Sequence, residues 1–152
     1  MTDTMTRIQR SQCMSRIKSK NTGPEIAVRR IVHRLGCRFR LEPQRLPGSP
    51  DIILTRHRAV IFVHGCFWHR HKNCRFASMP KPRKVFWRRK FEENVRRDRR
   101  VMQKLRKLRW NVLVIWECQV PDPDWLHCRI SGFLSKGNSI AAGSGAIAGK
   151  NK

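Results

Sequence analysis

The sequence has few acidic residues and lacks any apolar stretch long enough to cross a membrane. Its 152 residues include 10 Asp and Glu against 34 Lys and Arg, which gives a formal net charge of +24. An excess of this size predicts a polyanionic partner, because each well-placed Lys or Arg releases condensed counterions from a phosphate backbone. Charge alone does not separate an enzyme from a binding protein. The missing apolar run predicts a protein without a membrane-spanning segment.

The start of the chain, "MTDTMTRIQRSQCMSRIKSK", lacks the apolar middle of a secretory signal peptide. A basic start that contains Ser and Thr also occurs in mitochondrial transit peptides, but Asp3 and the polar continuation argue against that alternative. We therefore expect a cytoplasmic protein. Cysteines in that compartment are reduced thiols or metal ligands rather than disulfides. The six cysteines are Cys13, Cys37, Cys66, Cys74, Cys118 and Cys128.

The length of the chain fits one folded domain with a buried core. Residues 1–21 are polar, basic and aperiodic, which predicts a flexible arm that becomes ordered on a partner. The folded domain is expected to comprise residues 22–130. From residue 131 onward the sequence is rich in Gly, Ser and Ala, so residues 131–152 are expected to form a disordered tail.

Helix-capping residues and the spacing of apolar residues along the chain predict the element order α-β-β-β-α-β. Thr22 can cap a helix whose first turn contains Pro24 and which stops at Gly36. The apolar runs "DIIL" and "AVIFV", joined by "TRHR", are typical of a hairpin. This order predicts an α/β fold with a small mixed sheet flanked by helices. The other expected elements are a strand over residues 37–42, a long basic helix over residues 84–109 and a strand over residues 111–116.

Cysteine and histidine side chains with metal-ligand spacing follow the hairpin. Cys66, His71 and Cys74 lie within nine residues, and Cys118 follows the last predicted strand. Structural zinc sites take four tetrahedral sulfur or nitrogen ligands, so a set of three cysteines and one histidine would complete the shell. The alternative is that the cysteines are small buried apolar residues and that His71 is a surface histidine. The spacing favours a structural Zn²⁺ site.

One acid and two histidines form a second chemical group. Asp51 begins the first strand of the hairpin, which returns His64 to the same end of the sheet, and His69 follows a few residues later. A carboxylate that holds Mg²⁺ beside a neutral imidazole can hydrolyse a phosphodiester, since the metal neutralises the phosphate and the histidine takes a proton from the attacking water. The alternative for Asp51 alone is an aspartate that closes a turn.

Two further carboxylates each have two interpretations. Glu25 either completes the capping box of its helix or reaches metal-bound water as a second carboxylate. Asp98 interrupts the apolar stripe of the long helix, where an ionised carboxylate needs a partner. That partner is either an Arg of the same helix or the imidazole of His69, whose tautomer the carboxylate would fix.

Two pairs of adjacent aromatic residues bracket the loop before the long helix. Core packing is the ordinary explanation for any one of these rings. Adjacent residues cannot all face one core, however, and exposed rings beside a basic surface suit insertion between bases. Residues 81–110 contain fourteen Lys and Arg against three acids, which provides such a surface. The pairs are Phe67-Trp68 and Phe86-Trp87.

Together these residues resemble the very-short-patch repair (Vsr) endonucleases of the restriction-endonuclease-like superfamily. The resemblance rests on "RSQCMSRIKSKNTGPE", "LPGSPDIIL", "AVIFVHGCFWHRH", "NVRRDRR" and "LVIWEC", which span about residues 10–120. It implies a restriction-endonuclease-like core and a Mg²⁺-dependent enzyme. Such an enzyme nicks duplex DNA 5′ to the thymine of a T·G mismatch, the lesion left when 5-methylcytosine deaminates. It would act as a monomer on the bacterial nucleoid, with mismatch-repair proteins as candidate partners.

The resemblance also implies roles for individual residues. Asp51 and the backbone carbonyl of Val63 would hold Mg²⁺, and Val63 stands where the family pattern has Thr, so a side-chain role is lost there. His69 would be the general base, oriented by Asp98, and His64 would be a further catalytic histidine. The other implied residues are Glu25 in the outer surroundings of the metal, the zinc ligands Cys66, His71, Cys74 and Cys118, and the DNA-wedging rings Phe67, Trp68 and Trp87.

A second departure from the family pattern and two competing functions accompany this resemblance. The loop before Cys74 is one residue longer than the family pattern, which shifts the register of that ligand. The competing functions are a restriction-type nuclease of the same superfamily that cuts unmismatched sites, and a non-catalytic basic zinc protein that coats nucleic acid. Asp51 with His69 favours an enzyme, and the paired aromatic rings favour mismatch recognition.

Overall fold

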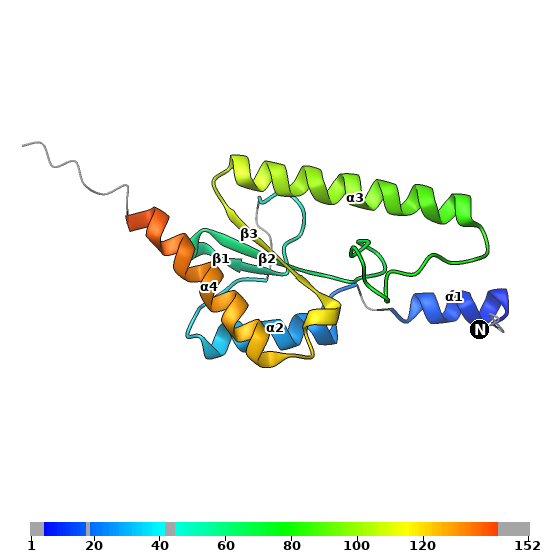
Figure 1. Ribbon diagram of the computed structural model, residues 1–152, viewed down its shortest axis with the longest axis horizontal. Coiled ribbons are helices and arrows are strands. Elements are labelled where there is room, and N and C mark those ends of the chain that lie inside the picture. Colours follow the sequence, from blue (N-terminus) through cyan, green and yellow to red (C-terminus); the bar gives the residue numbers. More distant parts are fainter. Residues whose placement is uncertain (1–4, 18, 42–44, 143–152) are drawn as a thin grey trace, which may run out of the picture.

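The computed structural model describes residues 5–17, 19–41 and 45–142, with only the backbone described over residues 138–142. None of the helices in these ranges is long and apolar enough to span a membrane. In chain order the elements are α1 (Arg7–Ser15), α2 (Gly23–Arg34), β1 (Ile52–Leu54), η1 (Thr55–His57), β2 (Ala59–His64), α3 (Lys84–Lys107), β3 (Asn111–Trp116), η2 (Glu117–Gln119) and α4 (Pro123–Ala142), as Figure 1 shows.

A three-stranded sheet in the order β1-β2-β3 lies at the centre of this arrangement. β1 and β2 form the expected antiparallel hairpin, in which Ile52 lies opposite Ile61. β3 runs parallel to β2 and pairs Trp116 with His64. A parallel neighbour requires a long crossover connection, which the loop after β2 and the 24-residue α3 provide. The sheet is therefore mixed, and the prediction of a small α/β fold is confirmed.

Helices cover both faces of the sheet (Figure 1). Side chains alternate along β2, so Ile61 packs with α2 and α4 while Val60 and Phe62 pack with Leu105 of α3. His64 continues the series of Val60 and Phe62 and so lies on the α3 face, at the end of the strand. The alternation of one strand thus places a buried histidine beneath the basic helix.

The prediction of a strand over residues 37–42 is wrong for residues 37–41. In that segment only Arg40 forms a bridge, exchanging two backbone hydrogen bonds of 2.8 Å with Ile53. Gly36 leaves α2 with a φ of +74°, and Cys37 and Phe39 then pack on the core beside α2. The alternation of apolar residues therefore reflects the partial burial of Cys37 and Phe39 in an irregular segment rather than strand pairing, and Leu41 is exposed.

The arm contains the helix α1, which no apolar period predicted. A capping box begins this helix, because Thr6 and Gln9 each bond the backbone N–H of the other. α1 buries none of its residues, and Ile8 is 71% exposed. Because α1 buries none of its residues, burial in a core imposed no apolar period on its sequence, and the capping residues were the available signal. The ordering of the arm on a partner stays a prediction.

The expectation of a disordered tail is wrong for residues 131–142, which continue α4. Leu126, Ile130 and Leu134 follow one another at single helical turns and are all buried. Gly137 lies where α4 approaches β3, since a Cβ there would be 3.2 Å from the side-chain amide of Asn111. Apolar spacing therefore outweighs the low helix propensity of the glycines. The rest of the predicted tail, residues 143–152, lies outside the described residues.

We predict that Leu134→Ala lowers the free energy of unfolding by about 2–4 kcal/mol, because it removes buried methyl groups and leaves a cavity. Lys136→Ala, on the exposed side of the same helix, is the matched control and should change that free energy by less than about 0.5 kcal/mol. Denaturant unfolding followed by circular dichroism measures both. Equal, small effects would show that this part of α4 does not contribute to the core.

Candidate active site and metal centre

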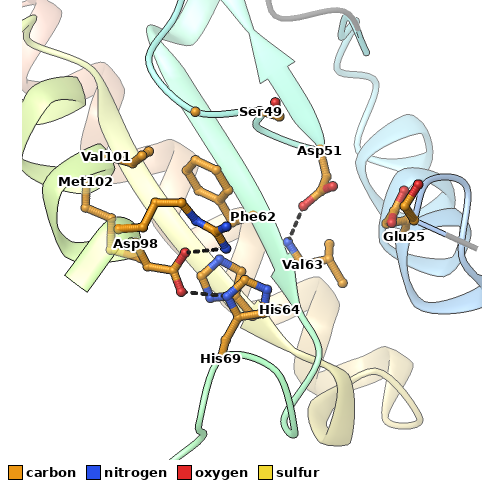
Figure 2. Close-up of a pocket in the computed structure, with 13 residues that line it drawn as sticks. Glu25, Ser49, Asp51, Phe62, Val63, His64, His69, Asp98, Val101 and Met102 are labelled. Atoms are coloured by element: carbon orange, nitrogen blue, oxygen red, sulfur yellow. Dashed lines mark hydrogen bonds and ion pairs between the residues drawn. The ribbon is translucent and has the colours of Figure 1, made fainter. Parts of the chain in front are cut away.

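A cavity of about 360 Å³ lies between the end of β2 and α3 (Figure 2). Asp51 reaches it from the start of β1 and His64 from the end of β2. His69 enters from the loop after β2, and Asp98 enters from α3. The structure therefore brings together the acid, the two histidines and the helix carboxylate that the sequence pattern singled out, from two strands, a loop and a helix.

Asp51 is held against β2 through both its backbone and its side chain. Its N–H donates to the carbonyl of Ile61 at 3.0 Å, and its Oδ2 accepts a 2.6 Å hydrogen bond from the backbone N–H of Val63. Burial raises the pKa of Asp51 to about 6, and the nearby charge of Glu25 acts in the same direction, against the hydrogen bond from Val63. A carboxylate whose charge is disfavoured in this way gains from a bound cation.

The two histidines are stacked, with ring centroids 3.9 Å apart and planes 9° apart (Figure 2). Oδ2 of Asp98 lies 2.6 Å from Nδ1 of His69, and Oδ1 lies 3.8 Å from the guanidinium of Arg97. Both expected kinds of partner thus contact Asp98, but only His69 is at hydrogen-bonding distance. Burial, and then the charge of His69, lower the pKa of His64 to about 4, which keeps that ring neutral near pH 7.

Glu25 lies in the first turn of α2, next to the cap of that helix and at the edge of the cavity. Its N–H donates to the hydroxyl oxygen of Thr22, which caps α2, at 3.4 Å. The buried carboxylate accepts hydrogen bonds from the Asn21 N–H (2.9 Å), the Thr22 hydroxyl (3.0 Å) and Arg29 (3.1 Å). In a capping box this carboxylate would accept from the backbone N–H of the cap residue, Thr22. Here it accepts from the N–H of Asn21, the residue before the cap. Glu25 also lines the cavity that contains Asp51.

The four expected metal ligands also come together. The ligand atoms of Cys66, His71, Cys74 and Cys118 all lie within 4.8 Å of one another. Nδ1 of His71 is 3.6 Å from Sγ of Cys66 and 3.3 Å from Sγ of Cys118. These separations fit a tetrahedral ion, because zinc–ligand bonds of about 2.0–2.3 Å place neighbouring ligand atoms about 3.5 Å apart. The extra loop residue before Cys74 does not remove it from the group.

Two residues that the sequence analysis missed support this metal-ligand group. The ring of Trp116 stacks on His71, with centroids 4.3 Å apart and planes 8° apart. Oε2 of Glu117 accepts a hydrogen bond from the backbone N–H of Cys66 at 3.3 Å. Such contacts orient metal ligands and are part of a metal site. Both residues directly precede Cys118, and this adjacency was the signal available in the sequence.

The expected wedging rings form one aromatic cluster, which consists of Phe67, Trp68 and Trp87. Ring centroids of Phe67 lie 5.1 Å from Trp68 and 5.7 Å from Trp87, with edge-on geometry. All three rings are half-buried, and Phe67 and Trp87 pack on the buried Phe91. The backbone carbonyl of Trp68 accepts a 3.1 Å hydrogen bond from Asn94, a contact that the sequence analysis missed. The rings are therefore held at the surface and are not enclosed in the core.

A second cavity, of about 670 Å³, lies beside the aromatic cluster. Phe67, Trp68 and His69 line one part of it, and Met14 and Ile17 of the arm line another. Two rings of the aromatic cluster, the arm and one of the stacked histidines therefore border a common space.

The fold and these cavities describe a small α/β protein in which an acid and paired histidines lie beside a strongly basic helix, an arrangement suited to the cleavage of a phosphodiester. A family profile described as "DNA mismatch endonuclease Vsr" matches residues 2–75. The chain is 44% identical over 134 residues to "Type II nicking enzyme V.XorIIP" of Xanthomonas oryzae pv. oryzae, covering 88% of this chain and 98% of that relative. It is 40% identical over 118 residues to "DNA mismatch endonuclease Vsr" of Escherichia coli, covering 78% of this chain and 75% of that relative.

A third relative, "Type II nicking enzyme V.NmeAIP" of Neisseria meningitidis, is 40% identical over 120 residues, covering 79% of this chain and 85% of the relative. The chain belongs to the Vsr DNA mismatch endonuclease family. It is therefore an endonuclease that acts on DNA, and the interpretation as a non-catalytic zinc protein is set aside.

The pKa of Asp51 predicts a specific dependence of stability on pH. Because folding raises this pKa from 3.8 to about 6, the contribution of Asp51 to stability is fully present below pH 4 and is lost as the pH rises through 6. The side chain of the variant Asp51→Asn does not ionise, so the variant does not lose this stability as the pH rises. Without added divalent cations, we expect it to melt at a higher temperature than the parent at pH 8, with a difference that shrinks toward pH 4.

Thermal unfolding by circular dichroism from pH 4 to pH 8 measures this difference. His64 contributes the opposite dependence on pH, but it is present in both proteins and is removed when the two melting curves are subtracted. A difference in melting temperature that stays constant across the whole range would contradict the raised pKa of Asp51.

Proposed function

We propose that this chain is a Mg²⁺-dependent endonuclease that nicks duplex DNA on the 5′ side of the thymine in a T·G mismatch. The observation that carries this proposal is the shared cavity of Asp51 and His69, with the aromatic cluster directly beside it. The name of the Escherichia coli relative, a DNA mismatch endonuclease, supports the same specificity. We further propose a restriction-endonuclease-like core and a monomer that acts on the bacterial nucleoid in the cytoplasm.

In this proposal Asp51 and the backbone carbonyl of Val63 hold Mg²⁺. The bound ion supplies charge neutralisation at the phosphate and a more acidic water. Asp51 suits this role because burial disfavours its charge and an adjacent cation would restore it. Glu25 lies close enough to influence the pKa of Asp51, and it would orient water in the outer surroundings of the ion.

His69 is proposed as the general base. The 2.6 Å contact with Asp98 fits a ring whose Nδ1 carries the proton and donates it in a hydrogen bond, which leaves Nε2 able to accept a proton from water. Asp98 then stabilises the imidazolium that forms. His64 stacks on the same ring and remains neutral, so it supports the orientation of His69 without adding positive charge that would oppose protonation.

The four-residue metal-ligand group is proposed to hold a structural zinc ion. Four protein ligands would fill a tetrahedral shell and leave no position for water, as in structural sites. Cys66, His71 and Cys74 belong to the loop after β2, whereas Cys118 follows β3. The ion would therefore fix to the sheet the same loop that contains His69 and the aromatic cluster.

The aromatic cluster is proposed to recognise the mismatch by insertion into the DNA stack. A T·G pair stacks and pairs less stably than T·A, so separating the bases beside it costs less. Phe67, Trp68 and Trp87 would replace the lost stacking, at about 1–3 kcal/mol per base. The second cavity, which Phe67, Trp68 and the arm line, offers a place for one part of the duplex beside these rings, and the arm is proposed to lie along the minor groove.

Cutting at an unmismatched site is the second candidate function. It rests on the names of two relatives, which are called type II nicking enzymes. A nuclease of that kind would treat T·A and T·G duplexes alike. The half-buried, clustered aromatic rings favour mismatch recognition instead, because ordinary base readout does not require an unstacking wedge.

We predict that the protein with Mg²⁺ nicks a labelled duplex carrying one T·G pair and leaves an otherwise identical T·A duplex intact. Asp51→Asn should yield no nick while its affinity for the duplex stays near that of the parent, because many basic residues supply that affinity. Denaturing gels measure the nick, and fluorescence anisotropy measures binding. Equal nicking of both duplexes would favour the unmismatched-site nuclease, and a fully active Asp51→Asn would place the active site elsewhere.

Metal analysis of the purified protein should find about one zinc ion per chain, retained in buffer without Mg²⁺. Cys118→Ser should lose that ion and unfold at a lower temperature. Cys128→Ser is the matched control, because Cys128 lies exposed on α4, and this variant should keep both the zinc and the stability. A folded, active preparation without zinc would show that zinc has no structural role in this protein.

A further inference from the structure

We propose that Arg97 of α3 is a further catalytic residue, whose guanidinium contacts the phosphate that is cut and stabilises the negative charge that develops on it. This inference rests on the proposed active site around Asp51 and His69. It concerns a residue that the sequence analysis did not single out among the fourteen basic residues of the segment 81–110.

The side chains that line the cavity include more acidic than basic groups. Three carboxylates lie there: Glu25, Asp51 and Asp98. Glu25 is paired with Arg29 outside the lining, and Asp98 is paired with His69. A phosphodiester that enters carries one more negative charge, and hydrolysis adds another. The cavity therefore needs cationic groups besides any ion that Asp51 holds.

Arg97 is the one Lys or Arg among the described residues that line this cavity. It belongs to α3, directly before Asp98, so the rigid helix that orients the proposed base also sets the position of this guanidinium. Its side chain is 60% exposed, and it can therefore meet a DNA backbone that approaches from solvent. The neighbouring Arg96 lines a different cavity, beside Phe91.

The contact between Arg97 and Asp98 leaves the guanidinium available. At 3.8 Å it is an ion pair that is too long for a hydrogen bond. A guanidinium has five N–H donors in a planar fork that matches two oxygens of a phosphate. The ion pair therefore holds the charge at the edge of the cavity, and its donors remain for a phosphate there.

The step in which Arg97 would act is the attack of water on phosphorus. The water oxygen forms a bond to phosphorus, its proton passes to Nε2 of His69, and the bond from phosphorus to the leaving sugar oxygen breaks. The leaving oxygen takes a proton from solvent. As the attacking oxygen adds, charge accumulates on the two non-bridging oxygens. Donors already aimed at those oxygens stabilise this state more than the ground state, and this difference accelerates the reaction.

Arg97→Gln tests the proposal, with Arg96→Gln as the control for the same loss of charge on the adjacent position of α3. Nicking of the T·G duplex is measured in single turnover with the protein in saturating excess, so that weaker binding does not enter the rate. We expect Arg97→Gln to be slower by about 100-fold, the usual effect of removing one donor to a developing oxyanion. Arg96→Gln should nick at the parental rate, and Arg97→Lys should recover part of the loss.

Sulfur substitution separates a phosphate contact from a role in merely steadying Asp98. Duplexes carry a phosphorothioate of defined stereochemistry at the cut position. We expect one diastereomer to slow the parent even with Mn²⁺ in place of Mg²⁺, because sulfur accepts a hydrogen bond from the guanidinium poorly. That penalty should vanish in Arg97→Gln. If the penalty persists in the variant, or if Arg97→Gln matches Arg96→Gln in rate, Arg97 does not contact the phosphate.

Asp51→Asn, measured in parallel, separates this proposal from the one on which it rests. If Asp51→Asn is inactive while Arg97→Gln keeps the parental rate and sulfur penalty, the role of Arg97 is wrong and the site stands. If Asp51→Asn nicks at the parental rate, the site itself is wrong, and the role of Arg97 is lost with it.

Discussion

The parallel pairing of β2 with β3 is the constraint on which both groups of functional residues depend. In that register His64 lies opposite Trp116. Cys66 lies two residues after His64 and Cys118 lies two residues after Trp116, and the sulfur atoms of both cysteines belong to the same metal-ligand group. The same register leaves His64 on the face that α3 covers, stacked on His69. A shift of one residue would turn these side chains to the opposite face of the sheet and separate the ligands.

Helix α3 fixes the position of the loop after β2 relative to the sheet. Asn94 and Asp98 are one turn apart on the helix, and they bind two consecutive loop residues, the carbonyl of Trp68 and the ring of His69. Helix α3 therefore supports both the proposed base, His69, and the ring that is proposed to enter the DNA, Trp68. A displacement of Trp68 by DNA would be transmitted to its neighbour His69 through the backbone. Recognition and catalysis would in this way be coupled by adjacency in the sequence, without a separate moving element.

Sequence reasoning succeeded where the signal was local and chemical. The metal-ligand group followed from the residue types and their spacing, because few roles other than ligation suit such a mixture of cysteine and histidine. For Asp98 the pattern indicated only that the carboxylate needs a partner, and it left an Arg of the same helix and His69 as alternatives. Sequence reasoning failed for the strand over residues 37–42 and for α4, where tertiary packing decides. Leu134 is buried because α4 packs on the core cluster that α2 shares with the sheet, and no local pattern reveals this packing. Arg97 was hidden for a similar reason, since fourteen basic residues look alike until one of them lines a cavity.

The cavity is lined by more acidic than basic side chains, whereas the chain as a whole is strongly positive. A net charge of +24 attracts a DNA backbone over long distances, at exposed side chains that need no metal. The cavity, by contrast, contains three carboxylates, and burial already raises the pKa of Asp51 to about 6. Entry of a phosphate into the cavity would therefore be favoured by cationic charge beside Asp51. In the proposed mechanism, affinity for DNA and the capacity to cut it belong largely to different residues. An undistorted duplex would be held on the basic surface, and the distortion at a mismatch would bring a phosphate within reach of His69.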